Sequence, residues 1–395
     1  MQLNVLVLNS GSSSLKFQVL AMPAETRICR GLVERIGSDE ATMHFTSDRS
    51  QFKKSVKAGT HKEALEHIVN TLLDTQIGVI KSTSEIAAIG HRVVHGGDLF
   101  SKTTRIDKRV KDAIDNLSRL APLHNPHNLE GIKLSELWFP EALQVAVFDT
   151  AFHRTIPEHA RRYALPKKLF TESGIQVFGF HGTSHKFVAE QVAPLLPEPG
   201  KLITLHLGNG CSATAILDGK SIDHSLGFTP TGGLVMGTRT GDLDPGIILY
   251  LIQNFGYTPE TVERLITAKS GLLGLTGFSD MRDVEREAAA GNPDCIVALE
   301  ITAYRLRKYI GAYTAAMNGL DGLVFTGGIG EHSVGIRQRV CSDLEVLGIV
   351  LDRERNQNLG TGVQAIQAET SKVRIWVVPT DEELEIARQT CAILL

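Results

Sequence analysis

The chain has 395 residues, which is long for one compact core and favours two domains. With 41 Lys and Arg against 44 Asp and Glu, its net charge of -3 predicts no nucleic-acid partner and no membrane-surface partner. The five cysteines lie far apart without a C-x-x-C motif, so we expect a reducing cytoplasm, no disulfide framework and no cysteine zinc site. No apolar run approaches the roughly 20 residues that a membrane helix needs.

The first expected elements are two strands joined by a small-residue turn. Residues 5–8 are apolar, residues 9–14 are Asn, Gly and Ser, and residues 15–20 alternate, a pattern typical of a β-hairpin. The leading apolar run is short and has no cationic flank, so a buried strand is expected there and not a signal peptide. Apolar residues spaced three and four apart then predict a helix over residues 61–80.

Two short apolar runs are each followed by polar residues. Residues 86–89 lead to Arg92, and residues 145–148 lead directly to Asp149. Ligand crevices in open α/β sheets lie at the carboxyl ends of parallel strands, so both runs predict ligand-contacting side chains. Asp149 at such a rim is expected to be a ligand or catalytic group, although it could instead cap the segment that follows.

The second half of the chain begins in the same way as the first. Residues 202–207 predict a strand, residues 208–212 a small-residue turn, and residues 213–217 a returning strand. This order repeats that of residues 5–20 about 200 positions later. The repeat is consistent with two related domains.

A long amphipathic helix is expected over residues 295–318, ending at Gly319. One face carries apolar residues every three or four positions: Ile296, Leu299, Ala303, Leu306, Ile310, Tyr313 and Met317. Such a face indicates packing against a sheet or another helix.

The end of the chain contains a strand, a glycine-rich loop and a helix in succession. Residues 323–325 predict a buried strand, residues 326–331 a glycine-rich loop, and Val334 the start of a helix. This order is typical of a phosphate- or nucleotide-holding arrangement. A strand at 375–378 and a last helix beginning with the acidic residues 381–383 complete the chain.

Four glycine-bearing turns point to phosphate chemistry. They are residues 9–14, 208–212, 232–241 and 327–330. Glycine allows backbone N–H groups to approach a phosphate closely, and such turns form anion nests. The chain has neither a Walker A motif nor a G-x-G-x-x-G opening a helix after the first strand, so P-loop and nicotinamide sites are disfavoured.

Two arginines and two histidines stand among small residues in these regions. The guanidinium groups of Arg92 and Arg239 suit bidentate recognition of carboxylate or phosphate, whereas the alternative is a surface arginine in a turn. His181 and His185 lack the glutamate of an H-E-x-x-H zinc motif. Metal binding stays open for them beside an imidazole that donates to a transferring phosphoryl oxygen.

Together these segments resemble the acetate kinase family over essentially the whole chain. The motifs that carry the resemblance occur in the family's order, at residues 8–16, 91–97, 147–153, 181–185, 206–210, 236–245 and 325–331. The resemblance implies an α/β fold of duplicated ribonuclease H-like domains, as in actin-like ATPases and sugar kinases, with ATP in an interdomain cleft. The N-terminal domain would comprise residues 1–150 plus 383–395 on the acyl and phosphate side. The C-terminal domain would comprise residues 151–382 on the nucleotide side.

The resemblance also implies roles for individual residues. The catalytic residues would be Asp149, His181 and Arg239, and Asn9 and Glu382 would hold Mg²⁺ or Mn²⁺. The carboxylate substrate would be bound by one arginine and an apolar pocket: Arg92, Val94, Leu123, Phe180 and Pro230. The nucleotide and its phosphates would be bound by residues of the turns and their neighbours: Ser12, Ser14, Lys16, His206, Leu207, Gly208, Asn209, Gly210, Asp280, Met281, Arg282, Gly328, Ile329, Gly330, Glu331 and His332.

The expected activity is the reversible reaction ATP + acetate = ADP + acetyl phosphate, by direct in-line phosphoryl transfer in a homodimer. ATP and ADP would be co-substrates. A propionate or butyrate kinase is the alternative within this class. A different class is an actin-like ATPase that serves as an interaction protein, since a fold alone does not fix function. Arg92 and His181 in their motifs favour the kinase, because a plain ATPase would not need them.

Overall fold

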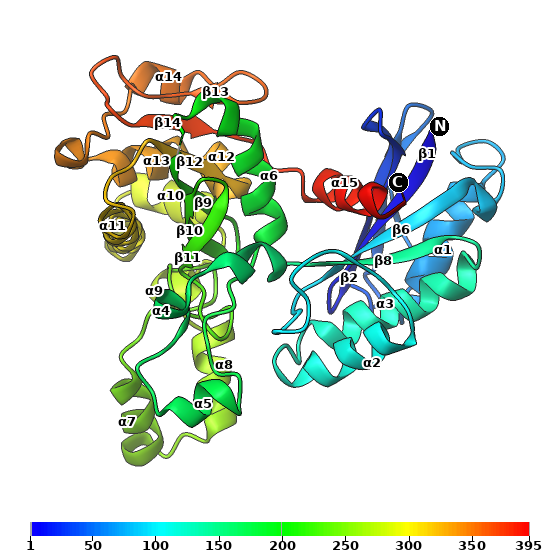
Figure 1. Ribbon diagram of the computed structural model, residues 1–395, viewed down its shortest axis with the longest axis horizontal. Coiled ribbons are helices and arrows are strands. Elements are labelled where there is room, and N and C mark those ends of the chain that lie inside the picture. Colours follow the sequence, from blue (N-terminus) through cyan, green and yellow to red (C-terminus); the bar gives the residue numbers. More distant parts are fainter. Residues whose placement is uncertain (1, 199, 395) are drawn as a thin grey trace. The chain divides into compact units, whose positions relative to one another are not determined.

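The structure, a computed structural model, describes residues 2–198 and 200–394 of the chain. The chain divides into two compact units, Met1–Phe152 with Asp381–Leu395, and His153–Thr380 (Figure 1). In the described residues, no helix is long and apolar enough to cross a bilayer. Each unit contains one β-sheet with helices packed on it.

The sheet of the first unit has eight strands in the order β5-β4-β3-β2-β1-β6-β8-β7. The strands are β1 (Leu3–Ser10), β2 (Ser14–Met22), β3 (Thr26–Glu34), β4 (Thr42–Ser47), β5 (Gln51–Ser55), β6 (Ile86–Val93), β7 (Thr104–Arg105) and β8 (Leu143–Phe148). Strands β1 to β5 form an antiparallel meander, whereas β6 pairs parallel with β1 and β8 pairs parallel with β6. The hairpin expected over residues 5–20 is confirmed as β1 and β2.

Helices cover both faces of this sheet. They are α1 (His61–Leu73), α2 (Lys108–Asn116), α3 (Asn125–Trp138) and α15 (Glu382–Leu394), with short 3-10 turns η1 (Thr83–Glu85), η2 (Leu117–Arg119) and η3 (Ala151–Thr155). Because side chains alternate along β1, Leu6 packs in the core on the α1 side, while Val5 packs against Ile386 of α15. The C-terminal helix α15 therefore belongs to the first unit (Figure 1).

The helix predicted over residues 61–80 is shorter in the structure. Helix α1 starts after Thr60, whose side chain accepts the N–H of Glu63, and ends at Leu73. The Oδ1 atom of Asp74 accepts the N–H groups of Gln76 and Ile77 at 2.8 and 3.0 Å. This local turn gives the backbone an alternative to the helix, which explains the early end.

The sheet of the second unit has six strands in the order β11-β10-β9-β12-β14-β13. The strands are β9 (Lys201–Leu207), β10 (Cys211–Leu217), β11 (Lys220–His224), β12 (Gly322–Thr326), β13 (Gln364–Ala365) and β14 (Arg374–Val377). Strands β9 to β11 are antiparallel, and β12 pairs parallel with both β9 and β14. The first unit shows the same core, β3-β2-β1-β6-β8, so the prediction of a duplicated ribonuclease H-like α/β fold is confirmed.

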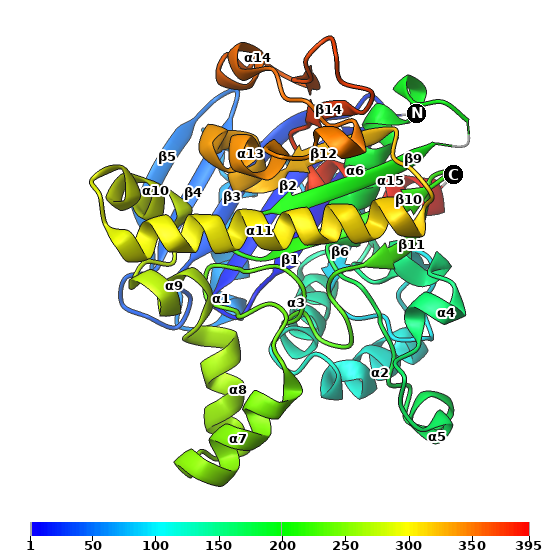
Figure 2. The ribbon, with the colours of Figure 1, turned by 90° about the vertical axis from the view of Figure 1, so that its left-hand side faces the viewer.

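One long helix, α11, lies across the strands of the second sheet (Figure 2). The helices of this unit are α4 (Glu158–Arg161), α5 (Lys167–Thr171), α6 (Gly182–Val192), α7 (Pro245–Phe255), α8 (Pro259–Ala268), α9 (Gly271–Thr276), α10 (Met281–Ala289), α11 (Pro293–Ala316), α12 (Gly327–His332), α13 (Val334–Cys341) and α14 (Arg353–Gln357), with 3-10 turns η4 (Ala193–Leu195) and η5 (Glu345–Leu347). The predicted buried face of α11 is confirmed from Leu299 onward. For Ile296 it is wrong, because the inward stripe begins at the preceding Cys295 and leaves Ile296 beside it, 41% exposed.

His91 anchors β6 inside the first unit and gives the fold a pH dependence. Its Nε2 atom lies 2.8 Å from Gln144 Oε1 and 3.2 Å from Ser135 Oγ. Burial lowers the pKa of His91 to about 4, despite the opposing hydrogen bond with Gln144. The unfolded chain binds this proton more readily, so the contribution of neutral His91 to stability is complete above pH 6.5 and is lost as the pH falls toward 4.

We expect His91→Gln to flatten the pH dependence of unfolding between pH 6.5 and 4. The lowered pKa corresponds to about 3 kcal/mol of stability that acid removes from the wild type and not from the variant. The measurement is denaturant unfolding followed by Trp138 fluorescence in a Trp376→Phe background, which leaves a single indole, in the first unit. His67→Gln is the matched control, and equal pH slopes in all three proteins would refute the role of His91.

Candidate active site

Asn9, Arg92 and Asp149 meet at one edge of the first sheet. They lie at or just beyond the carboxyl ends of β1, β6 and β8. The parallel pairing of β6 with β1 and with β8 places these strand ends side by side. Arg92 Nε donates to Asp149 Oδ1 at 3.1 Å, Nη2 donates to Asp149 Oδ2 at 2.5 Å, and Nη1 donates to Asn9 Oδ1 at 3.4 Å. A guanidinium has five N–H groups, so this geometry leaves two of them for an anionic ligand.

Glu382, the first residue of α15, adds a second carboxylate to this cluster. Its Oε2 atom lies 3.9 Å from Arg92 Nε. Burial raises the pKa of Glu382 to about 7; Arg92 opposes the rise, and the nearby Asp149 and Glu383 carboxylates add to it. Burial alone would lower the pKa of Arg92, but Asp149 and Glu382 hold it above its ordinary value. The cluster is therefore rich in oxygen ligands and short of positive charge.

The predicted phosphate residues of the first hairpin lie in a tight turn. Gly11 N donates to Ser14 O at 2.8 Å, Ser12 is exposed, and Ser14 is half-buried. Lys16 Nζ forms an ion pair of 2.6 Å with Glu383, a buried residue that was expected only in a first helical turn. The signal for Glu383 was too weak to use, since acidic residues are common at helix starts.

His181 is held by a chain of hydrogen bonds in the second unit. Its backbone adopts the left-handed conformation (φ 56°) at the N-cap position immediately before α6, which is uncommon for a residue other than glycine. Nδ1 lies 2.9 Å from Ser212 Oγ, which lies 2.7 Å from Nε2 of His185. His185 in turn contacts Thr204 Oγ1 at 2.7 Å, and burial holds the pKa of His185 well below its ordinary value. Ser212 was expected only as part of the glycine turn and Thr204 only as part of a strand, yet both fix this order.

Arg239 and His181 converge on Gly210. A Cβ built on Gly210 would lie 3.4 Å from His181 Nε2 and 3.8 Å from Arg239 Nη1. Arg239 Nη1 donates to the carbonyl of Pro230 at 2.9 Å, and no carboxylate in the described part of the chain forms an ion pair with it. Burial lowers the pKa of Arg239. A half-buried guanidinium without a carboxylate partner favours binding of an anion at this point.

A cavity of about 410 Å³ lies beside these groups in the same unit. Its walls come from the second glycine turn, the first half of α10 with the residues before it, and α12 with the residue after it: Gly208, Asn209, Ser279, Asp280, Met281, Arg282, Glu285, Gly328, Ile329, His332 and Ser333. Asp280 accepts the N–H of Arg282 and pairs with its guanidinium, so Arg282 holds the pKa of that carboxyl down at about 2. The cavity has the size of a small-molecule site.

Residues 326–331, predicted as a glycine-rich loop, instead form the turn into α12. That prediction is wrong because Gly327, at φ +76°, allows the chain to reverse directly from β12 into a helix. Glu331 Oε1 accepts the N–H of Gly327 at 3.0 Å and that of Thr380 at 3.1 Å. The helix N-terminus still faces the cavity with Gly328 and Ile329.

Several residues predicted to bind the nucleotide or the acyl group do not line this cavity, and some of them lie in the first unit. His206, Leu207, Gly210, Gly330 and Glu331 do not line it; His206 Nδ1, for example, bonds Ser184 Oγ at 2.8 Å. The four predicted acyl-pocket residues are divided between the units, with Val94 buried and Leu123 63% exposed in the first, and Phe180 buried and Pro230 half-buried in the second.

Arg337 on α13 holds α12 in place, although no motif marks it in the sequence. The side chain is fully buried and donates to the carbonyls of Gly330 and Glu331 at 2.9 Å each, and to Asn356 Oδ1 at 2.6 Å and O at 3.0 Å. A buried cation satisfied by carbonyls is costly to remove, because each acceptor then stays buried without a donor.

We expect Arg337→Met to destabilise the second unit by about 3–5 kcal/mol, as loss of one partner from a buried charged network does. Trp376, in β14 of that unit, reports the unfolding in a Trp138→Phe background. Exposed Arg353→Met on α14 provides the comparison. A loss below about 1 kcal/mol, the range of ordinary surface changes, would contradict this role for Arg337.

The duplicated ribonuclease H-like topology, with a small-molecule cavity in its second unit, defines the actin-like class of nucleotide-binding folds. Within that class, residues 4–388 match the model of the acetokinase family, and the chain belongs to this family. The resemblance stated from the motifs is thereby confirmed.

Curated relatives and solved structures agree with this family. The chain is 52% identical over 392 residues to the acetate kinase of Flavobacterium johnsoniae, covering 99% of this chain and 100% of that one. It is 48% identical over 395 residues to the acetate kinase of Thermotoga maritima, with 98% of each covered. The structure of Porphyromonas gingivalis acetate kinase matches at a TM-score of 0.93 and 43% identity, with full coverage of both chains. A propionate kinase from Francisella tularensis matches at 0.93 and 42%, with 99% of both covered.

Proposed function

We propose that this chain is an acetate kinase that catalyses ATP + acetate = ADP + acetyl phosphate. The observation that carries the proposal is the match to acetate kinases along essentially the whole chain, at 52% identity to one of them. The side chains grouped within each unit support it: Arg92 beside Asn9 and Asp149 in the first unit, and His181 and Arg239 beside Gly210 in the second.

The nucleotide would occupy the cavity of the second unit. The N-terminal ends of α10 and α12 border that cavity, and backbone N–H groups at helix starts favour anions. The walls contributed by Asn209, Asp280 and Met281 would contact the nucleoside, and Gly208 leaves room for the backbone to approach it.

Arg92 would bind the acetate carboxylate through the two N–H groups that Asp149 and Asn9 leave available. Val94, Leu123, Phe180 and Pro230 remain our proposal for the contacts of the acetate methyl group. Acetate is ionised at neutral pH, since carboxyl groups of this kind have a pKa of about 4 to 5. The attacking oxygen therefore needs no general base, and we assign Asp149 to positioning Arg92 and the metal.

The first-unit cluster has the donor set that Mg²⁺ or Mn²⁺ requires. Asn9, Asp149 and Glu382 present hard oxygen donors, and the pKa of Glu382, raised by burial and by neighbouring carboxylates, indicates a place where added positive charge is favourable. We propose that Asn9 and Glu382 hold the ion, with Asp149 nearby. When bound, it would neutralise charge on the phosphates.

The transfer itself would be direct and in line. Negative charge spreads over the equatorial oxygens of the moving phosphoryl group, and preorganised donors aimed at that charge lower the barrier. His181 Nε2 and Arg239 Nη1, which border the same glycine, are the donors we assign to this task. Ser212 and His185 keep the imidazole of His181 in a fixed orientation.

Three wider features also belong to the proposal. The first unit would act as the acyl and phosphate domain, expected from the sequence at residues 1–150 plus 383–395, and the second as the nucleotide domain, expected at residues 151–382; the units themselves divide two residues away from these bounds, which leaves Glu382 in the first. The protein would work in the cytoplasm, consistent with five cysteines that are all free thiols. A homodimer is supported by α7, which buries none of its residues and exposes the apolar side chains Ile247, Leu249, Tyr250 and Phe255. Sedimentation of the purified chain tests the dimer.

Trapping of acyl phosphate with hydroxylamine tests the proposed reaction. Incubation of the chain with ATP, Mg²⁺ and acetate should yield acetyl hydroxamate in step with ADP. If the rate of ADP formation does not depend on acetate and no hydroxamate forms, the protein would instead belong to the actin-like ATPase class.

Propionate is the second candidate acceptor, because the propionate kinase of Francisella tularensis matches as well in structure as the acetate kinase does. One extra buried methylene is worth about 0.8 kcal/mol, a factor of about four in kcat/KM. Values of kcat/KM for acetate, propionate and butyrate rank the acceptors, and acetate should be first.

A further inference from the structure

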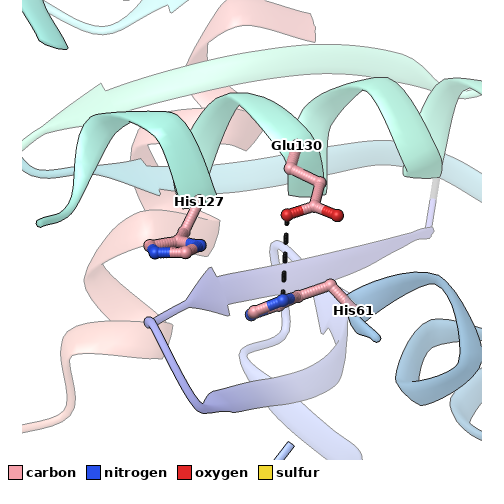
Figure 3. A group of neighbouring side chains, drawn as sticks. All are labelled: His61, His127 and Glu130. Carbon is pink, nitrogen blue, oxygen red and sulfur yellow. Dashed lines mark ion pairs between the residues drawn. The ribbon is translucent and has the colours of Figure 1, made fainter. Parts of the chain in front are cut away.

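A group of metal-ligating side chains outside the proposed active site stands out in the first unit. His61, His127 and Glu130 each offer one donor atom, and these atoms lie within 4.8 Å of one another (Figure 3). His127 and Glu130 are three residues apart on α3, so they share one face of that helix, and His61 opens α1, which packs on α3. We propose that these three residues form a second, transition-metal site, suited to Zn²⁺.

The hydrogen bonding of His61 prepares it to be a ligand. Its Nε2 atom lies 2.7 Å from the carbonyl oxygen of Gly11, and a carbonyl only accepts, so Nε2 carries the proton. In the neutral ring Nδ1 then bears the lone pair, and Nδ1 faces Glu130 Oε2 at 3.8 Å. Metal-binding histidines usually donate their other N–H to a backbone carbonyl in this manner, which fixes the tautomer and the ring orientation.

The donor set and its exposure suit zinc more than magnesium. Imidazole nitrogen is a borderline donor that suits zinc and not magnesium, and two histidines with one carboxylate and an open fourth position are common at zinc sites. The rings of His61 and His127 stack with centroids 5.4 Å apart. The His61 side chain is 8% exposed and that of Glu130 is 46% exposed, so an ion can enter from the side of Glu130. Bond lengths near 2.0 to 2.1 Å require the three donors to close by about 1 Å, and the exposed Glu130 side chain can move that far.

The simpler alternative is an ion pair between protonated His61 and Glu130. It would explain the contact of 3.8 Å, but it gives no role as a donor to His127, whose ring centroid lies 5.4 Å from that of His61. A cation between the three groups uses all of them. The two alternatives differ in whether the protein binds metal here at all.

The proposed site touches the hairpin turn that the active-site proposal assigns to phosphate. Gly11, whose carbonyl receives the His61 proton, begins that turn, and Asn128, between the two α3 ligands, donates to Ser10 O at 2.7 Å. A metal on Nδ1 makes the Nε2 proton more acidic and strengthens its bond to Gly11. We therefore expect an occupied site to rigidify residues 10–14; this consequence for catalysis rests on the proposed function, whereas the metal site itself does not.

Zinc titration of the full chain tests the site. After chelation and removal of the chelator, with excess Mg²⁺ present to saturate oxygen sites, the wild type should take up one Zn²⁺ per chain in competition with a fluorescent chelator. His127→Ala and Glu130→Gln, which change partly exposed side chains, should each weaken binding by at least about tenfold, the loss seen even when outer partners of metal ligands are removed. His67→Ala is the matched control. His67 lies on α1, the helix that begins with His61, and its Nε2 atom also contacts a backbone carbonyl, that of Lys57.

Two further readouts separate this site from binding elsewhere. Co²⁺ should give the visible absorption of a four-coordinate nitrogen and oxygen site in the wild type and in His67→Ala, and lose it in His127→Ala. Hydrogen exchange of the peptide covering residues 10–14 should slow on zinc addition only where the site is intact. Zinc uptake that is absent in the wild type, or equal in wild type, His127→Ala and Glu130→Gln, would overturn the proposal. Because none of these measurements uses turnover, they stand even if the acetate kinase reaction is not observed.

Discussion

Arg239→Ala should lower kcat by about a thousandfold or more, the range known for an arginine that offsets charge on a transferring phosphoryl group. In the second unit this guanidinium donates to the Pro230 carbonyl and borders Gly210 together with His181 Nε2. Its interaction would be made with the transition state more than with bound ATP, so KM for ATP should change little. Steady-state kinetics with purified protein measure both values.

Two companion variants make the Arg239 result interpretable. Arg239→Lys keeps the positive charge but loses the planar fork, so it should recover only part of the rate. Arg353→Ala removes an exposed arginine of the same unit and should leave kcat and the circular dichroism spectrum unchanged. A kcat for Arg239→Ala within a few-fold of wild type would refute its assignment to the transition state.

Arg92→Lys should lower kcat/KM for acetate by about 10- to 100-fold, as expected for loss of hydrogen bonds to a charged group. The lysine ammonium can still pair with Asp149, but it cannot hold that carboxylate and a second one in a bidentate manner. Most of the loss should fall in KM for acetate, while KM for ATP stays near its wild-type value. Kinetics at varied acetate and fixed saturating ATP provide the measurement.

Arg92→Ala is a harsher change, because it leaves the buried Asp149 carboxylate without the guanidinium. Added guanidinium ion should restore part of its kcat/KM, since the cation can occupy the vacated place between Asp149 and acetate. Equal effects of Arg92→Lys on acetate and ATP, together with no rescue of Arg92→Ala by guanidinium, would show that Arg92 does not bind the acceptor.

The sequence predicted the architecture well because the relevant signals are local. The hairpin of β1 and β2, the buried face of α11 from Leu299, and the repeat of strand, turn and strand near residue 202 follow from side-chain periodicity and small-residue turns. Helix ends were less well predicted. The early end of α1 depends on one aspartate, Asp74, which bonds its own neighbouring N–H groups.

The candidate site was predictable only where a motif marked it. Arg92 and Asp149 follow two separate strands, and their pairing required the parallel register of β6 and β8 to bring them level. Arg337 carries no such signal, since an arginine in a polar helix segment resembles a surface residue until its burial is known. The pairing of His61 with Glu130 could not be predicted either. These residues are 69 positions apart in the chain and come together only because α1 packs on α3.

Binding of ADP with aluminium fluoride, a mimic of the phosphoryl group in transfer, tests most directly whether groups from both units act on one reaction. The proposed mechanism predicts that acetate tightens this complex in the wild type, and that Arg92→Lys and Arg239→Ala each abolish the tightening while ADP alone binds as before. If all three proteins bind ADP with aluminium fluoride equally tightly, with or without acetate, the proposed mechanism is contradicted.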